Sequence, residues 1–349
     1  MKVCLATYQA VMMLKGGPRT QILQSKAELE NLGVRISLFN SWKEFHRDDV
    51  DLVHFFGANI GTYHLAREIH KLGVPIVISP IFFTRHSHEY VHRVVRAGKI
   101  LKSFSPGIWT DYGMMAEMCS WASILAANTV DEARIFTEGM GFPEEKVRII
   151  PNGVEPRFEK GKPSLFRKTY GADKFILNVG HIGPGRKNVF RLIQALESIN
   201  HPAFIIGRIE NTKEGDRCVE LAKRNPRITI LESIDHNSDL LASAYAACDV
   251  FVLPSLFETP GIAALEAGLA GAKVAITPHG GTREYFGEFA NYVDPYSVKS
   301  IRDGIQIALI RQKDKQLRDR IRKEYLWNDV AKHLVSVYQT LVPSVARKR

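Results

Sequence analysis

Short apolar runs alternate along this chain with longer segments of helical period, and this alternation limits the fold more than any other feature. One series runs through VCLATY, RISLFN, DLVHFFG, PIVISPIFF, ILAAN and VRIIPNG. A second series runs through FILNVG, AFIIG, ITILES, DVFVLPS and KVAITPHGG. Buried strands that alternate with helices are typical of parallel sheets with helices on both faces. The sequence therefore predicts an α/β fold of two consecutive parallel-sheet domains, in which these runs are buried strands.

The polar stretch 151–163, which contains glycine and proline, separates the two series. We place an N-terminal domain at residues 1–158 and a second domain at residues 159–324. The later segment 324–341 has apolar residues at helical spacing, and this spacing does not tell which domain the helix packs on; the residues are Trp327, Val330, Leu334, Val337 and Leu341. Ligands bind at the carboxyl ends of the strands in open α/β sheets, so we expect a ligand in a cleft between the domains.

Composition and cysteine usage narrow the class of protein. Hydrophobic residues make up 45% and charged residues 24% of the chain, as in ordinary globular proteins. No run approaches the apolar length of a transmembrane helix, and the first residues lack the pattern of a secretion signal. The four cysteines are scattered, which argues against a disulfide framework or a zinc site. We therefore expect a cytoplasmic protein.

Most of the net charge of +10 lies in two segments, 85–102 and 311–324, each with a net charge of +4. In the first, a basic row and an apolar row lie on opposite sides of a predicted helix; they are Arg85, His88, His92, Arg96 and Lys99, and Tyr90, Val91, Val94, Val95 and Leu101. Such a helix fits an anionic membrane surface or an anionic substrate, or its apolar stripe packs on its own domain. Nucleic acid is not an expected partner, because no aromatic platform or zinc finger accompanies the charge.

The segment PSLFETPGIAALEAGLAGAKV, residues 254–274, carries the strongest chemical signal. It predicts a strand end, a short loop with Glu258, and a helix that is capped by Thr259 and has Pro260 in its first position. Backbone amides of the first turn would then bind a phosphate group. These amides belong to Gly261, Ile262 and Ala263.

Glu266 lies one turn further along the same predicted helix face. There it would accept hydrogen bonds from hydroxyl groups near a bound phosphate. The alternative is an ordinary αβ unit with two incidental acids. An acid flanked by Ala264, Leu265 and Ala267 is unusual in such a helix, so we favour a site with a sugar on one side and a ribose on the other.

Two glycine loops add to this signal. NVGHIGPGRKN, residues 178–188, matches neither a dinucleotide fingerprint nor a P-loop, but Arg186 and Lys187 offer two adjacent cations to a diphosphate. In LKGGPRT, Gly16 and Gly17 precede a predicted helix. They would permit close backbone approach to a phosphate or a sugar, or they form a plain loop.

Taken together, these motifs resemble the retaining nucleotide-sugar glycosyltransferases of family 4. The resemblance covers nearly the whole chain and includes the GG loop, IPNGVE, GPGRKN, the Glu-x7-Glu element of Glu258 and Glu266, HGGTREY and LWNDVAKHLVSVY. It implies the GT-B architecture, in which two Rossmann-like domains face each other across a cleft and the last helix, in residues 325–349, returns to the N-terminal domain. The first domain would bind the acceptor, and the second would bind the nucleotide-sugar donor.

The resemblance also implies roles for single residues. Glu258 would be the catalytic residue and contact hydroxyls of the donor sugar, and Glu266 would bind the ribose. The amides near Gly261, Ile262 and Ala263, with Arg186 and Lys187, would hold the diphosphate. Gly16 and Gly17 would close over it from the first domain. The family implies no cofactor and no required metal, and the chain shows no obvious Asp-x-Asp pair.

Three positions depart from the family pattern. His181 stands where members often have an arginine after the strand glycine, and we place it in the donor site. Pro260 stands where a phenylalanine is usual, which removes one N–H that could meet a sugar hydroxyl. Pro80 or Ile81 falls about where many members carry a first-domain histidine near the reacting sugar.

These features predict a retaining hexosyltransferase. It would move a sugar from a UDP-, GDP- or ADP-linked donor to a saccharide or lipid-linked acceptor, in polysaccharide or glycolipid biosynthesis, in the cytoplasm or on the inner face of a membrane. Cations and helix amides would stabilise the departing nucleoside diphosphate. The alternative is a non-catalytic relative that binds a sugar nucleotide or a glycan as a scaffold or sensor.

Overall fold

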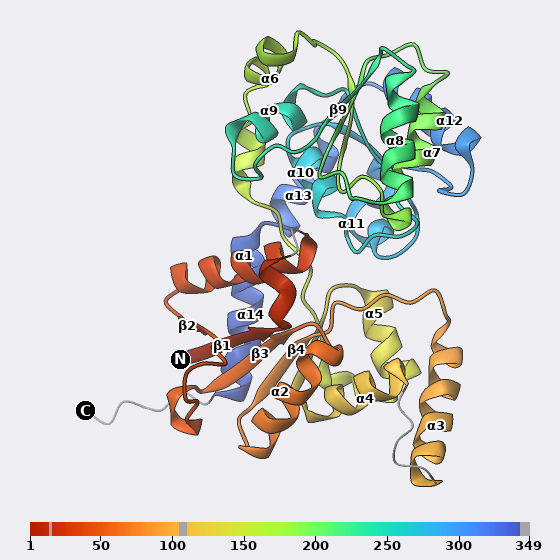
Figure 1. Cartoon of the computed structure of the whole chain (residues 1–349). Coiled ribbons are helices and arrows are strands. Elements are labelled where there is room, and N and C mark those ends of the chain that lie inside the picture. Colours follow the sequence, from red (N-terminus) through yellow and green to blue (C-terminus); the bar gives the residue numbers. More distant parts are fainter. Residues whose placement is uncertain (14–15, 105–109, 343–349) are drawn as a thin grey trace. The chain divides into compact units, whose positions relative to one another are not determined.

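The computed structural model describes residues 1–13, 16–104 and 110–342 (Figure 1). Leu14 and Lys15 of the GG loop and residues 343–349 of the expected last segment lie outside the described residues. The chain forms two compact units. The first comprises Met1–Gly153 together with the chain from Trp327, and the second comprises Val154–Leu326.

The first unit is built on a six-stranded parallel sheet in the order β2-β1-β3-β4-β5-β6. The strands are β1 (Lys2–Thr7), β2 (Arg35–Leu38), β3 (Leu52–Phe56), β4 (Ile76–Ser79), β5 (Ile124–Ala127) and β6 (Val147–Ile149). The main helices are α1 (Gly17–Asn31), α2 (Ile60–Lys71), α3 (His88–Phe104), α4 (Asp111–Trp121) and α5 (Val130–Arg134). Strands β3, β4 and β5 are buried along their whole length, as expected for strands covered by helices on both faces.

The second unit repeats this plan with the strand order β12-β11-β10-β7-β8-β9. Its strands are β7 (Ile176–Val179), β8 (Ala203–Ile206), β9 (Ile228–Leu231), β10 (Val250–Leu253), β11 (Lys273–Ile276) and β12 (Asn291–Tyr292). Its helices are α6 (Pro163–Tyr170), α7 (Val189–Leu196), α8 (Lys213–Lys223), α9 (Asp239–Ala247), α10 (Ile262–Leu269), α11 (Thr282–Phe286), α12 (Val298–Ile310) and α13 (Gln316–Glu324). All strand pairs are parallel, so the predicted fold of two parallel-sheet domains is confirmed.

Two predicted strands differ from their expected environment, and both lie at an edge of the first sheet. In β6, which VRIIPNG forms, none of the residues Val147–Ile149 is buried, so this prediction of a buried strand was wrong. RISLFN forms β2, but three of its four strand residues are exposed. The reason is its place in the sheet, because β2 lies at the edge and pairs only with β1. The interpretation of this run as a buried strand was wrong.

The last helix, α14 (Trp327–Leu341), packs against α1 in the first unit. Its buried residues Trp327, Val330 and Leu334 join the core formed by β1, β3 and α1. Trp327 lies so close to Gly153 that a Cβ atom at that glycine would come within 2.6 Å of the indole ring. The predicted return of the last helix to the N-terminal domain is therefore confirmed. Among the described residues, no helix has both the length and the hydropathy needed to cross a bilayer.

A buried polar group joins α14 to the sheet. His54 on β3 is fully buried, with its Nδ1 atom 2.6 Å from the Tyr338 hydroxyl and its Nε2 atom 2.9 Å from Ser79 Oγ. Each ring nitrogen therefore has a partner, which removes the cost of leaving a polar atom unsatisfied in the core. Burial lowers the pKa of His54 to about 3, so the ring is neutral in the folded protein.

The stability of the protein is expected to fall in acid because of His54. In the unfolded chain this histidine takes up a proton near its ordinary pKa of 6.5, whereas in the folded chain it does so only near 3. Between these values the unfolded state binds more protons, and the free energy of unfolding falls by up to about 1.4 kcal/mol per pH unit.

Urea unfolding at neutral and mildly acidic pH tests this expectation. The variant His54→Gln should lose less stability on acidification than the wild type. The control His64→Gln removes a histidine whose side chain is 78% exposed and should follow the wild type. If His54→Gln and the wild type fall in parallel, the buried histidine does not contribute to acid sensitivity.

Candidate functional site

Two loops of the second unit leave the sheet at neighbouring strands. Strands β7 and β10 pair with each other, and the chain runs from β7 to β8 on one side while β10 and β11 lie on the other. The strand order thus reverses between β7 and β10. In open parallel sheets, the carboxyl ends of the strands at such a reversal form the usual ligand site. Arg186 and Lys187 follow β7 in a short 3-10 helix, η6 (Gly185–Lys187), and Glu258 follows β10.

Glu258 is the centre of the charged cluster at this reversal. Its side chain is buried, and its Oε1 atom accepts a hydrogen bond from Lys187 Nζ at 2.6 Å and from Arg186 at 3.3 Å. Burial raises the pKa of this carboxyl, but the neighbouring charges of Lys187 and Arg186 outweigh that effect and hold the pKa below its ordinary value. Glu258 is therefore ionised at neutral pH. The structure brings together three residues that the sequence placed in one site.

The backbone of Glu258 is fixed by the HGG segment. The Glu258 amide donates to the carbonyl of His279 at 3.1 Å, and the Gly281 amide donates to the carbonyl of Glu258 at 3.0 Å. Gly280, between them, has a φ of +87°, and a Cβ atom there would lie 2.1 Å from the Glu258 carbonyl oxygen. Only glycine fits this close approach in this conformation. The HGG motif thus holds the loop that presents the carboxylate.

Asn188 holds the basic loop, and the sequence analysis missed it. Its side chain is buried, and its Nδ2 atom donates to the carbonyls of Pro254 at 2.8 Å and Pro295 at 2.7 Å. The backbone of Asn188 has a φ of +58°, a conformation that asparagine tolerates better than most residues. The Leu256 amide also donates to the Arg186 carbonyl at 2.8 Å, so the two loops are tied together. A hint was present in the sequence, since asparagine after a basic pair is a common turn residue.

His181 lies on the same loop after β7, but it does not contact Glu258. Its Nδ1 atom lies 3.1 Å from Glu210 Oε1, and its side chain is 32% exposed. Gly183, two residues further along, has a φ of +119° and approaches Gly215, which brings this loop close to the start of α8. Its assignment to the donor site stays a prediction.

Helix α10 begins later than the sequence suggested. Its first residue is Ile262, and its N-cap is Gly261, with a φ of +85°. Thr259 and Pro260 precede the helix and are joined by a cis peptide bond. The predictions that Thr259 caps the helix and that Pro260 is its first residue were therefore wrong.

The shift moves Gly261 out of the predicted first turn and leaves Ile262 and Ala263 in it. The amides of Ala264 and Leu265 donate to the Gly261 carbonyl, at 2.9 and 3.2 Å. The amides of Ile262 and Ala263 come before these first helical bonds, and both residues are partly exposed. Such amides at a helix N-terminus are suited to an anion.

Glu266 has a buried carboxylate whose two oxygens both have protein partners. Oε2 accepts a hydrogen bond from the Tyr245 hydroxyl at 2.7 Å, and Oε1 lies 2.7 Å from His236 Nε2. Burial lowers the pKa of His236, but the hydrogen bond and charge of Glu266, together with the charge of Glu155, outweigh it and raise that pKa. Tyr245 on α9 and His236 after β9 were not singled out from the sequence. Carboxylate oxygens accept more than one hydrogen bond, so Glu266 keeps the capacity for a further donor.

Gly16 and Gly17 belong to the other unit. Gly17 is the first residue of α1, and Gly16 precedes it with an extended backbone that does not require glycine. Apart from its chain neighbours, none of the described residues has an atom within 4 Å of a Cβ atom built at Gly16. Their contact with a ligand stays a prediction.

The arrangement has a clear chemical capacity. One ionised carboxylate, two cations and the first amides of a helix lie at the ends of adjacent strands. The cations and amides can stabilise an anionic group, and the carboxylate can accept hydrogen bonds from neutral hydroxyls. This combination suits a ligand with both phosphate and hydroxyl groups.

Two family models match the chain. Residues 17–158 match Glycosyltransferase Family 4, and residues 165–325 match Glycosyl transferases group 1. An uncharacterized glycosyltransferase of Methanocaldococcus jannaschii is 27% identical over 318 residues, which cover 85% of this chain and 75% of that protein. A D-inositol 3-phosphate glycosyltransferase of Geodermatophilus obscurus is 27% identical over 216 residues, 55% of this chain and 43% of that protein.

Solved structures show the same fold. A sucrose-phosphate synthase from Thermosynechococcus elongatus has a TM-score of 0.75 at 17% identity, over 97% of this chain and 98% of that one. The Anabaena protein HepE, in complex with UDP and glucose, has a TM-score of 0.70 at 16% identity, over 97% of this chain and 100% of that one. The two family models adjoin and span most of the sequence. The chain therefore belongs to glycosyltransferase family 4, whose members are retaining enzymes of the GT-B fold that transfer a sugar from a nucleotide sugar.

Proposed function

We propose that the second unit binds the donor through the cluster around Glu258. Arg186, Lys187 and the first amides of α10 bind the diphosphate, and Glu258 accepts hydrogen bonds from hydroxyls of the transferred sugar. Glu266 binds the ribose. The observation that carries this proposal is the contact of Lys187 and Arg186 with the buried Glu258 carboxylate where the strand order reverses.

The reaction follows from these charges. When the bond between the anomeric carbon and the phosphate oxygen breaks, negative charge develops on the nucleoside diphosphate. The two cations and the helix amides are already in place to stabilise that charge, so no reorganisation is needed in the transition state. The acceptor hydroxyl attacks on the same face of the sugar, its oxygen forms the new bond to the anomeric carbon, and its proton passes to the leaving phosphate. Glu258 stays ionised and orients the sugar.

The acceptor is a saccharide or a lipid-linked molecule, and the product is a polysaccharide or a glycolipid. The relatives carry names with different acceptors and donors, including a D-inositol 3-phosphate glycosyltransferase and a sulfoquinovosyl transferase of Arabidopsis thaliana. UDP is the first nucleotide to test, because the Anabaena structure contains UDP. GDP and ADP remain the alternatives.

A thermal-shift panel with UDP, GDP, ADP and their sugar conjugates identifies the donor. A ligand that binds only the folded state stabilises it by about 2.7 kcal/mol at a hundredfold excess over its Kd. We expect one nucleotide family to raise the melting temperature and the others to leave it unchanged. If none of these nucleotides and sugar conjugates raises the melting temperature, the protein does not bind a UDP-, GDP- or ADP-linked donor.

Loss of the Lys187 charge is expected to weaken diphosphate binding selectively. In Lys187→Met, the Kd for the bound nucleoside diphosphate should rise about 10- to 100-fold, the equivalent of one charge-assisted hydrogen bond. The Kd for the corresponding nucleoside should not change, because it carries no phosphate. Calorimetric titration measures both constants. The control Lys168→Met removes an exposed lysine of α6 and should bind both ligands like the wild type.

Loss of the Glu258 charge is expected to slow sugar transfer strongly and to leave binding of the nucleoside diphosphate intact. Glu258→Gln keeps the shape of the side chain, and kcat should fall by at least about 100-fold because hydroxyl orientation and charge complementarity are lost. Affinity for the nucleoside diphosphate should stay within a few-fold of the wild type. The control Glu220→Gln changes an exposed acid on α8. If Glu258→Gln transfers sugar at the wild-type rate, Glu258 is not the catalytic residue.

A further inference from the structure

Helix α3 leaves apolar side chains near both of its ends in solvent. Val91 and Val95, in the first half, are buried in the core of the first unit. Tyr90, Leu101 and Phe104 are 40%, 48% and 83% exposed, at helical spacing that puts them on one side. The prediction of a stripe packed on its own domain therefore holds for the two valines and fails for Tyr90 and Leu101.

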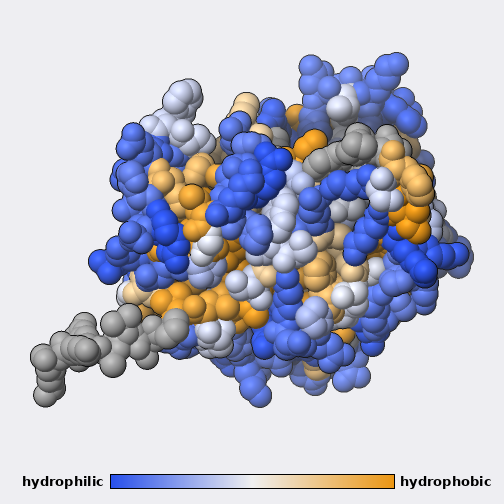
Figure 2. All heavy atoms as spheres, turned by 90° about the horizontal axis from the view of Figure 1, so that it is seen from below, coloured by the Kyte–Doolittle hydropathy of each residue, from blue (hydrophilic) through white to orange (hydrophobic). Residues whose placement is uncertain are grey.

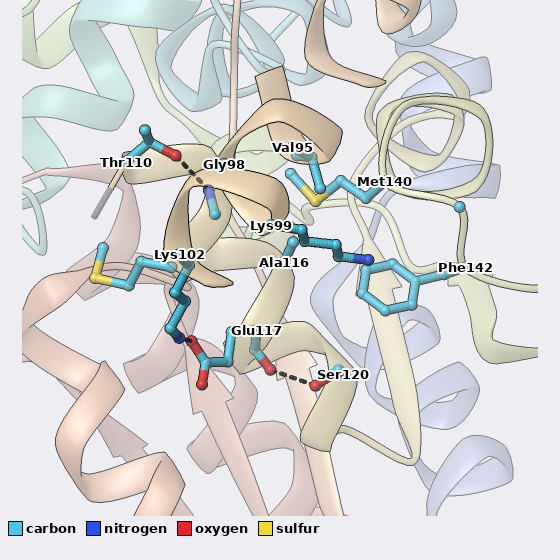
Figure 3. Close-up of a pocket in the computed structure, with 13 residues that line it drawn as sticks. Val95, Gly98, Lys99, Lys102, Thr110, Ala116, Glu117, Ser120, Met140 and Phe142 are labelled. Atoms are coloured by element: carbon cyan, nitrogen blue, oxygen red, sulfur yellow. Dashed lines mark hydrogen bonds and ion pairs between the residues drawn. The ribbon is translucent and has the colours of Figure 1, made fainter. Parts of the chain in front are cut away.

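A hollow lies beneath the second half of this helix. It is bounded by α3, α4 and the chain that follows the π-helical turn η3 (Ile135–Gly139), and its volume is about 350 Å³ (Figure 3). Its walls are mostly apolar and come from Val95, Met114, Ala116, Met140 and Phe142. This volume is at the lower end of the range for small-molecule pockets. Its walls suit a hydrocarbon chain.

Cationic side chains lie at the opening of this hollow. Lys99 and Lys102 line it, and Lys99 extends toward Phe142 (Figure 3). Lys102 forms an ion pair with Glu117 at 2.7 Å, so one acid already lies at the opening. Arg93 and Arg96, both exposed, continue the row of cations along α3. The face of the molecule in Figure 2 shows several hydrophobic areas among mainly hydrophilic side chains.

We propose that this region is a binding site for an anionic membrane lipid. One hydrocarbon chain of the lipid enters the hollow between α3 and α4, and its phosphate lies at Lys99 and Lys102. Charge complementarity selects the occupant, because an apolar cavity ringed by lysines and arginines fits a molecule with an apolar chain and a negative head. The residues that line the hollow all belong to the first unit, whereas the cluster around Glu258 belongs to the second.

A soluble lipid tests the pocket directly. Calorimetric titration of the full chain with dioctanoyl phosphatidylglycerol, below its micelle concentration, should show one site per chain. Glycerol 3-phosphate, which has the head but no chain, and dioctanoyl phosphatidylcholine, which has no net charge, should bind at least tenfold more weakly. Equal binding of glycerol 3-phosphate would assign the site to a free phosphate and overturn the proposal.

Two substitutions should move lipid affinity in opposite directions. Gly98→Leu places a side chain in the hollow, and its Cβ atom would meet Thr110 Oγ at an ordinary 3.6 Å. Leucine is also a better helix former than glycine, so the fold should be kept while lipid affinity falls at least tenfold. Glu117→Gln removes the acid at the opening and should strengthen binding several-fold. If these residues had only a structural role, Glu117→Gln would not increase the affinity for the lipid.

Vesicle sedimentation tests the surface around the pocket. The wild type should sediment with phosphatidylcholine vesicles that contain phosphatidylglycerol and not with phosphatidylcholine alone. Arg96→Gln and Lys99→Gln should each weaken this binding about fivefold, whereas the matched control Arg167→Gln on α6 should not. Circular dichroism melting checks that every variant is folded, and the Kd for the donor nucleotide should be unchanged in all of them. Equal sedimentation of Gly98→Leu and wild type, with equal affinity for the soluble lipid, would overturn the proposal.

Discussion

The buried charge of Glu258 is the constraint on which the proposed donor site depends. A carboxylate removed from water is stable only when cations and hydrogen bonds replace its hydration, and Lys187 and Arg186 supply them. Because these two residues come from the loop after β7 and Glu258 from the loop after β10, the pairing of β7 with β10 brings them within reach. The same electrostatic contact therefore joins two loops of the fold and gathers charges that suit a ligand with phosphate and hydroxyl groups.

The supporting residues show how such a site is held. Gly280 leaves room for the carbonyl of Glu258, and Asn188 donates to carbonyls on two separate segments. Neither residue needs to contact a ligand to be necessary. Their effect is to keep the carboxylate and the cations at fixed positions, which is the condition under which charges stabilise a transition state without reorganising.

Much of the fold and of the candidate site could be predicted from the sequence, and each successful prediction has a physical reason. The buried strands could be predicted because burial on both faces makes them continuous apolar runs. The Glu-x7-Glu spacing identified Glu258 and Glu266 as candidate site residues. The edge strands β2 and β6 were misjudged, since an apolar run does not show where its strand lies in the sheet. The start of α10 was misjudged because Thr-Pro is also a sequence that precedes a helix in an irregular loop. His236 and Tyr245 could not be found, because their contact with Glu266 joins segments that are distant in sequence.

The position of α14 has a consequence for the order in which the protein forms. The second unit is one continuous stretch of chain, whereas the first needs α14, which the ribosome makes after the whole second unit. Until then, the face of the first sheet that receives Trp327 and Tyr338 stays without its cover, and His54 lacks one of its two partners. The second unit can thus complete its core during synthesis while the first waits with exposed apolar surface. The synthesis of the first unit therefore begins before that of the second unit, and its folding is completed after it.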